Sequence, residues 1–328
     1  MLSRRLFIAE GVGIMKHRIE RHITFCVHQE RRAVVKRHTK KKQRTERFHR
    51  AVYASSQRLA TFLMEESANH AGCYFQYTTI DALEGMYKNG CLLLTQASGL
   101  NDLDEMGVES EEKERTYVAS FSTLRSESIA MWALYGMPAV RGIRIQFPKT
   151  TMRELVRVAL GENTQHSVFK AEFYKTKRRQ SLKPLKQSLR VEEAYLTDVI
   201  YRGKNALTWR GDVCVVKELK MNELLADTVA QGLVKDDFWR YENEVRLIVR
   251  LERKLEEYPS RIAIQLPTLL KKARVVLGPC FDKEPERELI EDLKKVKKVK
   301  FNESSCTRKV RFSRDCPCKG CTRQCLRA

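Results

Sequence analysis

The stretch Tyr241-Glu242-Asn243-Glu244-Val245-Arg246-Leu247-Ile248-Val249 predicts a β-strand with two chemically different faces. Side chains alternate along a strand, so one side should carry the apolar residues of this stretch and the other its charged residues. The apolar side comprises Val245, Leu247, Val249 and Leu251, and the charged side comprises Glu242, Glu244 and Arg246. Two acids and one guanidinium on one face are typical of either a solvated sheet edge or the floor of a functional site.

Strands and helices alternate on both sides of this stretch. Strands are predicted near residues 74–78, 91–95, 116–122, 141–147, 195–201, 261–266 and 273–277, and helices near 79–90, 131–135, 216–230 and 284–297. Several of these strands follow one another like the arms of hairpins. The pattern therefore favours a mixed α+β fold with a mainly antiparallel sheet over a doubly wound parallel sheet.

Charge divides the chain into three parts. The net charge of the 328 residues is +21, yet residues 1–50 hold 15 Lys or Arg against 4 Glu, and residues 294–328 hold 12 against 2 acids, so the segment between these two ends is neutral. We expect a basic N-terminal arm with a helix (1–72, with helical spacing over 45–64), an α+β domain (73–293) with a basic loop near 161–192, and a basic, Cys-rich tail (294–328).

The sequence also indicates in which cellular compartment the protein is expected. No run of 18 apolar residues is present, so no membrane-spanning helix is expected. Half of the ten cysteines are scattered singly, as buried thiols usually are in a reducing compartment. An organellar leader is disfavoured because Glu10, Glu20 and Glu30 interrupt the basic N-terminus. The expected localisation is cytoplasmic.

Six short motifs occur in a distinctive order. They are Tyr77-Thr78, Asn101-Asp102, Ser120-Phe121-Ser122, Met131-Trp132-x-x-Tyr135, Gly142-x-x-Ile145-x-Phe147 and Trp239-x-x-Glu242-Asn243-Glu244-x-Arg246. This series resembles the bacterial domain-of-unknown-function family number 2971 over about residues 74–282. That resemblance supplies a family but no established chemistry.

A second resemblance, to ADP-ribosyltransferases of the Arg/Ser/Glu type, implies chemistry. Those enzymes place a Ser-x-Ser strand before a Glu-x-Glu-Val strand, as Ser120-Phe121-Ser122 and Glu242-Asn243-Glu244-Val245 are placed here. The resemblance implies an ADP-ribosyltransferase-like fold and NAD as the substrate. It also implies that Glu244 binds the nicotinamide ribose and stabilises the oxocarbenium ion, and that Glu242 accepts the proton of the acceptor.

The same resemblance implies further site residues. Ser120 would brace the region of the first strand, and Trp132 or Tyr135 would stack on nicotinamide. The remaining cofactor contacts would come from Tyr77, Thr78, Ser122, Arg246 and Asn101. Tyr77 departs from the family pattern, which has His or Arg there. His166 is the one histidine within 74–282, so a histidine-dependent mechanism is disfavoured.

Other interpretations remain open at this stage. Glu242, Glu244 and Arg246 also fit a structural ion-pair ladder, and Trp132 and Tyr135 fit a hydrophobic core. A metal-dependent nuclease would need carboxylates such as Asp102, Asp104 and Glu105, whose spacing in a loop is a weak signal. A non-catalytic protein that binds nucleic acid through its basic ends is the main alternative to an enzyme.

The C-terminal tail carries a separate signal. Cys316, Cys318, Cys321 and Cys325 lie within ten residues, and four thiolates can close a tetrahedral zinc site. Lys and Arg residues around them would suit phosphate contacts, so both basic ends are predicted to bind nucleic acid or a nucleic-acid-bound protein. A role as a toxin or phage-defence effector is implied only by the resemblance to ADP-ribosyltransferases.

Overall fold

A computed structural model describes residues 39, 41–69, 72–100, 111–161, 168–175, 180–226, 232–253, 257–296 and 298–307. The chain forms two compact units, which meet between Ala54 and Ser55. In the first unit, residues 41–54 are helical. The second unit holds the remaining described helices and strands.

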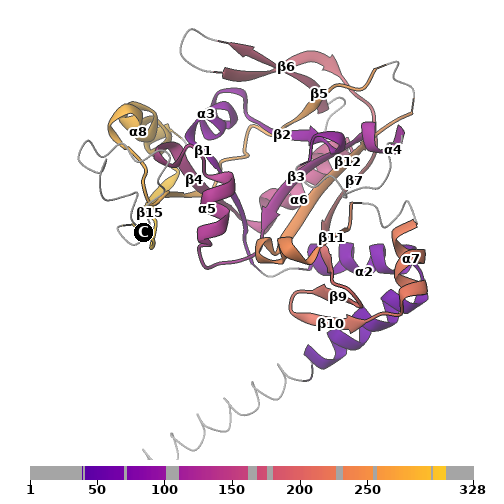
Figure 1. The fold of residues 1–328 in the computed structure, drawn as a ribbon. Helices are drawn as coiled ribbons and strands as arrows, with labels where there is room; N and C mark the ends of the chain where they lie inside the picture. The colour runs from indigo at the N-terminus through magenta and orange to yellow at the C-terminus, as the bar shows by residue number, and fades with distance from the viewer. Residues whose placement is uncertain are drawn as a thin grey trace, which may run out of the picture. The chain divides into compact units, whose positions relative to one another are not determined.

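The second unit is a mixed α+β structure built around a large, mainly antiparallel sheet (Figure 1). Its eleven strands are β1 (Tyr74–Thr79), β2 (Cys91–Gln96), β3 (Thr116–Ser122), β4 (Gly142–Phe147), β5 (Val168–Lys175), β6 (Gln180–Ser188), β7 (Val191–Asp198), β12 (Glu244–Leu251), β13 (Arg261–Gln265), β14 (Arg274–Leu277) and β15 (Lys300–Glu303). The parallel pair in this sheet is β14 with β15. The mixed, mainly antiparallel α+β fold expected from the sequence is confirmed.

A second, four-stranded sheet lies beside α7 (Figure 1). It contains β8 (Ile200–Arg202), β9 (Ala206–Trp209), β10 (Asp212–Val215) and β11 (Val234–Asp236) in the order β10-β9-β8-β11. The α-helices of the second unit are α2 (Ser56–Ala68), α3 (Ile80–Asn89), α4 (Glu111–Glu114), α5 (Ile129–Tyr135), α6 (Lys149–Ala159), α7 (Glu218–Ala226) and α8 (Arg287–Val296). Short 3₁₀ turns cover Ala97–Gly99, Ala139–Arg141, Asp237–Glu242 and Glu284–Glu286. No helix in the described ranges has the length and apolar character needed to cross a membrane.

The large sheet divides at β3. One edge of β3 pairs with β1 at Ser122 and with β2 at Tyr117 and Val118. The residues between, Ala119–Phe121, lie where β1 and β2 separate from one another. The other edge of β3 pairs along its whole length with β12, which in turn pairs with β7. We call this separation of β1 and β2 at Ala119–Phe121 the fork. It exposes part of one face of β3 in the middle of the sheet.

The main hydrophobic core covers the opposite face of the sheet. Alternation along β12 places Val245, Leu247 and Val249 in this core, as predicted. The helices α3 and α6 contribute further buried apolar side chains, including Leu83 and Leu155. Gly90 ends α3 in a left-handed conformation (φ 60°), which a glycine adopts without strain. The core thus leaves the charged face of β12 turned toward the fork.

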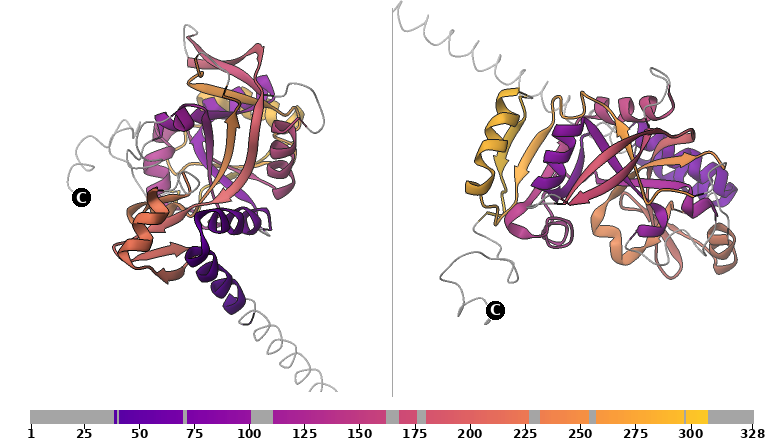
Figure 2. Two further views of the ribbon diagram at one scale, coloured as in Figure 1. Left: turned by 90° about the vertical axis from the view of Figure 1, so that its right-hand side faces the viewer. Right: turned by 90° about the horizontal axis from the view of Figure 1, so that it is seen from above.

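Three predicted segments differ from the observed ones. The segment 161–192, expected to be a basic loop, contains β5 and β6, an antiparallel hairpin that extends beyond the rest of the sheet (Figure 2). Pairing of β5 with β13 holds this hairpin, and the basic composition concealed it. The predicted strand 195–201 is two strands in different sheets. The predicted helix over 45–64 is interrupted at Ser55, whose hydroxyl caps α2 by accepting from the Arg58 amide.

The helix α2 belongs with the second unit rather than with an N-terminal arm that reaches residue 72. It packs against β7. The hydroxyl of Tyr74 on β1 donates a 2.9 Å hydrogen bond to the carbonyl of Ser67 on α2. The observed division between the two units lies between Ala54 and Ser55, about one helix earlier than the sequence indicated.

Candidate functional site

A cavity of about 280 Å³ opens at the fork of the large sheet. Its walls come from β1, β2, β3, α5, β11 and β12 and from the 3₁₀ turn before β12. The apolar part of its lining includes Phe75, Leu93 and Val118. The lining also carries the ionisable groups Tyr135, Lys235, Glu242, Glu244 and Arg246. An apolar cavity with a few convergent polar groups is the usual form of a small-molecule site.

Glu244 and Arg246 form a buried ion pair on β12. The Arg246 Nε donates to Glu244 Oε1 at 2.8 Å, and Nη2 donates to Oε2 at 3.0 Å. The side chain of Arg246 is 1% exposed, and β12 lies between β3 and β7. The strand is therefore not a solvated sheet edge. The bidentate geometry fixes the carboxylate plane of Glu244.

Glu242 lines the same cavity, but it does so from a 3₁₀ turn and not from the predicted strand. It ends the 3₁₀ turn Asp237–Glu242 and is not part of β12. Asn243 then takes a left-handed conformation (φ 43°), so the simple strand alternation fails at this residue. The side chains of Glu242 and Glu244 nevertheless converge, because Lys235 Nζ donates to Glu242 Oε2 at 2.8 Å and to Glu244 Oε2 at 3.3 Å.

The pKa values of the two carboxyl groups are shifted in opposite directions. Burial would raise the pKa of Glu244, but the charges of Arg246 and Lys235 outweigh it and lower this pKa to about 2. Burial and the charge of Glu244 raise the pKa of Glu242 above its ordinary value. One carboxylate is thus held ionised while its neighbour binds a proton more readily. Such a separation is how paired carboxylates divide acid–base work.

Lys235 and Tyr201 are site residues that the sequence analysis missed. Both come from the small sheet, where Lys235 on β11 is paired in register with Tyr201 on β8. The Tyr201 hydroxyl accepts a 2.8 Å hydrogen bond from the Glu244 amide. The ring of Trp239 lies 4.6 Å from Lys235 Nζ, a cation–π distance. A three-residue strand from a second sheet leaves no periodic signal that would reveal these residues.

Tyr135 lies in the cavity, whereas Trp132 lies behind it. The Tyr135 hydroxyl donates to Glu242 Oε1 at 2.5 Å, and burial together with this carboxylate raises the pKa of Tyr135. Trp132 is almost fully buried, with its ring 4.8 Å from that of Tyr77 in an edge-on arrangement. The predicted stacking role on a ligand is therefore open to Tyr135, and Trp132 instead supports Tyr77.

The two serines of the Ser-x-Ser strand take different positions. Ser120 is exposed in the cavity at the fork, and its hydroxyl favours the ionised form of Glu244. Ser122 is buried, and its hydroxyl donates to the Glu242 carbonyl at 2.6 Å. The Ser122 side chain thus braces the turn before β12, whereas the resemblance implied that Ser120 braces the region of the first strand. Of the first-strand residues, Tyr77 lines the cavity and Thr78 does not.

Several predicted residues lie outside the described part of the chain. They are Asn101, Asp102, Asp104, Glu105, Cys316, Cys318, Cys321 and Cys325. Within the described ranges, no group of three or more His, Cys, Asp or Glu side chains is arranged to hold a metal ion. The zinc site in the tail therefore stays a prediction.

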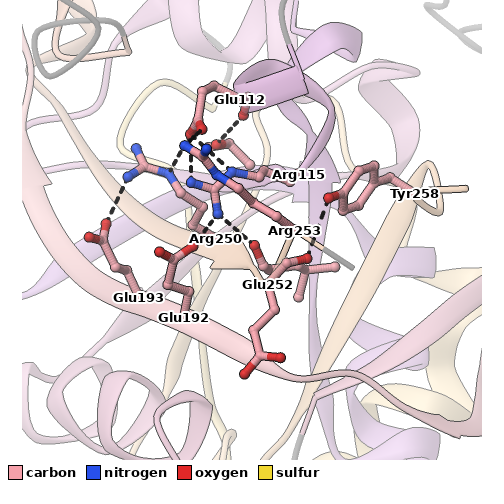
Figure 3. A network of polar contacts seen from close by, with 10 residues as sticks. Glu112, Arg115, Glu192, Glu193, Arg250, Glu252, Arg253 and Tyr258 are labelled. Carbon is pink, nitrogen blue, oxygen red and sulfur yellow. Dashed lines mark hydrogen bonds and ion pairs between the residues drawn. The ribbon is translucent and has the colours of Figure 1, made fainter. Parts of the chain in front are cut away.

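A second charged cluster occupies the other end of β12 (Figure 3). We call it the arginine network; it comprises Glu112, Arg115, Glu192, Glu193, Arg250 and Arg253. Glu112 accepts from Arg115 at 3.0 Å and from Arg253 at 2.5 Å, and Arg250 donates to Glu193 at 2.8 Å. Arg250 shares the charged face of β12 with Arg246 and Glu244, because an even number of residues separates them along the strand.

Neither a protein-family model nor a curated protein matches this chain. The resemblances drawn from the motifs therefore rest on the residues themselves, and the geometry described above carries the functional argument.

Proposed function

We propose that the cavity at the fork cleaves the N-glycosidic bond of NAD and transfers ADP-ribose to water or to a macromolecular acceptor, as in an ADP-ribosyltransferase-like enzyme. The observation that carries this proposal is the pair Glu242–Glu244, two carboxyl groups on one cavity wall with opposite pKa shifts. The arrangement around β3 also supports it, because Ser120 lies beside Glu244 in the same cavity.

The size and polarity of the cavity suit half of a dinucleotide. A volume of about 280 Å³ lies just below the roughly 300–1,000 Å³ found for small-molecule sites. It would accommodate a nicotinamide riboside, with the flat nicotinamide against the apolar wall of Phe75 and Leu93. The ribose would then face Glu244, and the rest of the dinucleotide would extend from the open side.

The proposed chemistry assigns one role to each carboxyl group. When the bond between the ribose C1′ and nicotinamide breaks, nicotinamide leaves with the bonding electrons and the ribose becomes positively charged. Glu244, held ionised by Arg246 and Lys235, stabilises this charge without having to reorganise. Glu242 accepts the proton of the attacking water or acceptor group as the new bond forms. The proton affinity of Glu242 is raised, which favours this step.

The decisive experiment measures nicotinamide release from NAD by the wild type and by Glu244→Gln, with DNA, RNA and cell-lysate proteins as acceptors. We expect the substitution to lower the rate by on the order of a hundredfold or more, because it removes the charge that stabilises the transition state. Glu112→Gln, which removes a carboxylate from the arginine network on the same sheet, is the matched control and should keep the wild-type rate.

Folding must be checked because Glu244 is buried. Ser120→Ala provides a milder variant, since Ser120 is exposed and its loss should slow release severalfold without affecting stability. If the wild type releases no nicotinamide with any acceptor, the proposal is wrong.

The second candidate is a non-catalytic protein that binds nucleic acid through its basic ends. The observation that favours it is the charge balance of the cavity wall, where Lys235 and Arg246 match Glu242 and Glu244 as in a structural ion cluster. In that case Glu244→Gln would change the stability of the protein but not its binding of nucleic acid. Nucleic-acid affinity would fall steeply with salt, as phosphate contacts require.

A further inference from the structure

Glu127 connects the C-terminal segment of the described chain with α5. Its Oε2 accepts from Trp132 Nε1 at 3.1 Å and also from the Ser304 hydroxyl. Its Oε1 accepts from the Ser305 amide at 2.8 Å. Burial opposes ionisation of this carboxyl group, but these donors outweigh burial and lower the pKa of Glu127. An ionised, partly buried carboxylate with three donors from two distant segments holds those segments together.

The helix α5 depends on such outside support. It spans Ile129–Tyr135, seven residues, and helices shorter than about 12 residues are marginal without tertiary contacts. Trp132 provides one such contact: its ring packs edge-on against Tyr77, and a Cβ atom at Gly136 would lie only 2.9 Å from it. Rotation of the helix would therefore displace the Trp132 ring from its contacts with Tyr77.

Tyr135, the last residue of α5, lines the cavity. The Tyr135 hydroxyl donates a hydrogen bond to Glu242, the carboxyl group with the raised pKa. The distance from Tyr135 to Glu242 depends on the orientation of α5. That orientation depends in turn on the Trp132 ring, whose N–H is held by Glu127.

We propose that Glu127 is a positioning residue for the cavity: by holding Ser304 and Ser305 to Trp132, it sets α5 so that Tyr135 reaches Glu242. The segment Ser304–Ser305 thus acts as a strap over α5. Ser304 is itself anchored, because its amide donates to the Leu277 carbonyl at 3.0 Å. The consequence for catalysis rests on the function proposed above, whereas the structural coupling does not.

A double-mutant cycle tests the coupling in the full-length chain. Urea unfolding is measured for the wild type, Tyr135→Phe, Glu127→Gln and the double variant. Tyr135→Phe should raise the unfolding equilibrium constant about tenfold in the wild type, as expected for loss of a hydrogen bond to a charged group. In the Glu127→Gln background it should raise it less than about twofold, because the contact is already lost.

Glu303→Gln is the matched control for this cycle. Glu303 lies next to Ser304, but its exposed carboxylate pairs with Lys283, so Tyr135→Phe should keep its tenfold effect there. If Glu127→Gln does not fold, Ser304→Ala replaces it, and the effect of Tyr135→Phe should fall at least threefold in that background. Additive effects of the two substitutions would overturn the inference.

An activity measurement separates this inference from the proposed function. The hydrogen bond from Tyr135 lowers the pKa of Glu242. If the wild type releases nicotinamide, Glu127→Gln and Tyr135→Phe should therefore both move the acid limb of the kcat profile to higher pH, with KM changed less than about twofold. Glu303→Gln should leave the profile in place. An acid limb that Glu127→Gln does not move would overturn the inference. If the wild type releases none, the proposed function fails, and the unfolding cycle alone decides the role of Glu127.

Discussion

The two ends of β12 carry charges on the same face but in different surroundings. At one end, Glu244 and Arg246 are buried with Lys235 and Glu242, and two of these four residues come from outside the strand. At the other end, Arg250 belongs to the arginine network, where the side chains of Glu193 and Arg253 are 46% and 64% exposed. Arg115 in this network is also buried, so the difference that matters is that Glu193 and Arg253 are exposed to water, whereas all four residues of the first cluster are buried.

The comparison shows why charge alone does not identify a site. Exposed ion pairs contribute about 0–1 kcal/mol, because water and salt already stabilise the separate charges. Buried pairs are costly to desolvate, so removal of one partner leaves an uncompensated charge. We therefore expect the two clusters to respond to the same kind of substitution by very different amounts.

The largest expected effect is on stability. Arg246→Gln should lower the free energy of unfolding by about 3–5 kcal/mol, because it leaves the buried charge of Glu244 paired with Lys235 alone. Arg253→Gln should lower it by about 1 kcal/mol or less, because Arg253 is mostly exposed. Urea unfolding at neutral pH measures both. Equal costs would mean that the two clusters do not differ in the way their burial indicates.

The second effect is on the pH dependence of stability. The pKa of Glu244 is lowered to about 2 from 4.5, so the unfolded state binds more protons between these values and stability rises with pH there. The stabilisation is present above about pH 4.5 and is lost as the pH falls toward 2. Glu242, whose pKa is raised, acts with the opposite sign: its contribution is lost as the pH rises.

Subtraction gives the contribution of Glu244 together with its coupling to Glu242, whose pKa the Glu244 charge helps to raise. The difference in unfolding free energy between the wild type and Glu244→Gln should grow from pH 2 to pH 4.5. The corresponding difference for Glu112→Gln should have the same sign but be smaller, because the arginine partners that lower the pKa of Glu112 act on a carboxylate that is 26% exposed. A Glu244→Gln difference that is constant over this range would show that Glu244 is not held ionised in the folded chain.

The smallest effect is the response to salt. The screening length falls from about 10 Å at 0.1 M to about 3 Å at 1 M ionic strength. The cost of Arg253→Gln should therefore almost vanish when urea unfolding is repeated at 1 M NaCl, while the cost of Arg246→Gln should persist. Loss of the Arg246→Gln penalty at high salt would indicate that solvent ions reach the buried cluster.

The elements that the sequence predicted well are those specified by local pattern. The predicted strand 116–122 is β3 itself, and the apolar face of β12 lies in the core as expected. Strict alternation and clear turn residues such as Gly90 account for this success. The hairpin of β5 and β6 was missed because β6 is polar and basic and contains Pro184, and because β5 is held by pairing with β13, about ninety residues later in the chain.

The residues of the candidate site also include some that the sequence identified correctly and some that it misplaced. Motif spacing identified Glu242, Glu244, Arg246 and Tyr135, and all four line the cavity. It misplaced Glu242 on the strand, although Asn243 is a residue type that tolerates the left-handed conformation observed there. Trp132 was identified as a ligand contact, but a motif cannot distinguish an aromatic side chain in a cavity wall from one packed behind it.

By itself, the sequence determined the two faces of β12, because alternation is a property of the extended backbone and requires no partner. Only the tertiary structure decided that the charged face would be buried, since burial depends on β3 and β7 pairing on either side of β12. It also decided which cation would join the two carboxylates. Lys235 reaches them from a different sheet, and no local rule connects a short strand of one sheet with a carboxylate of another.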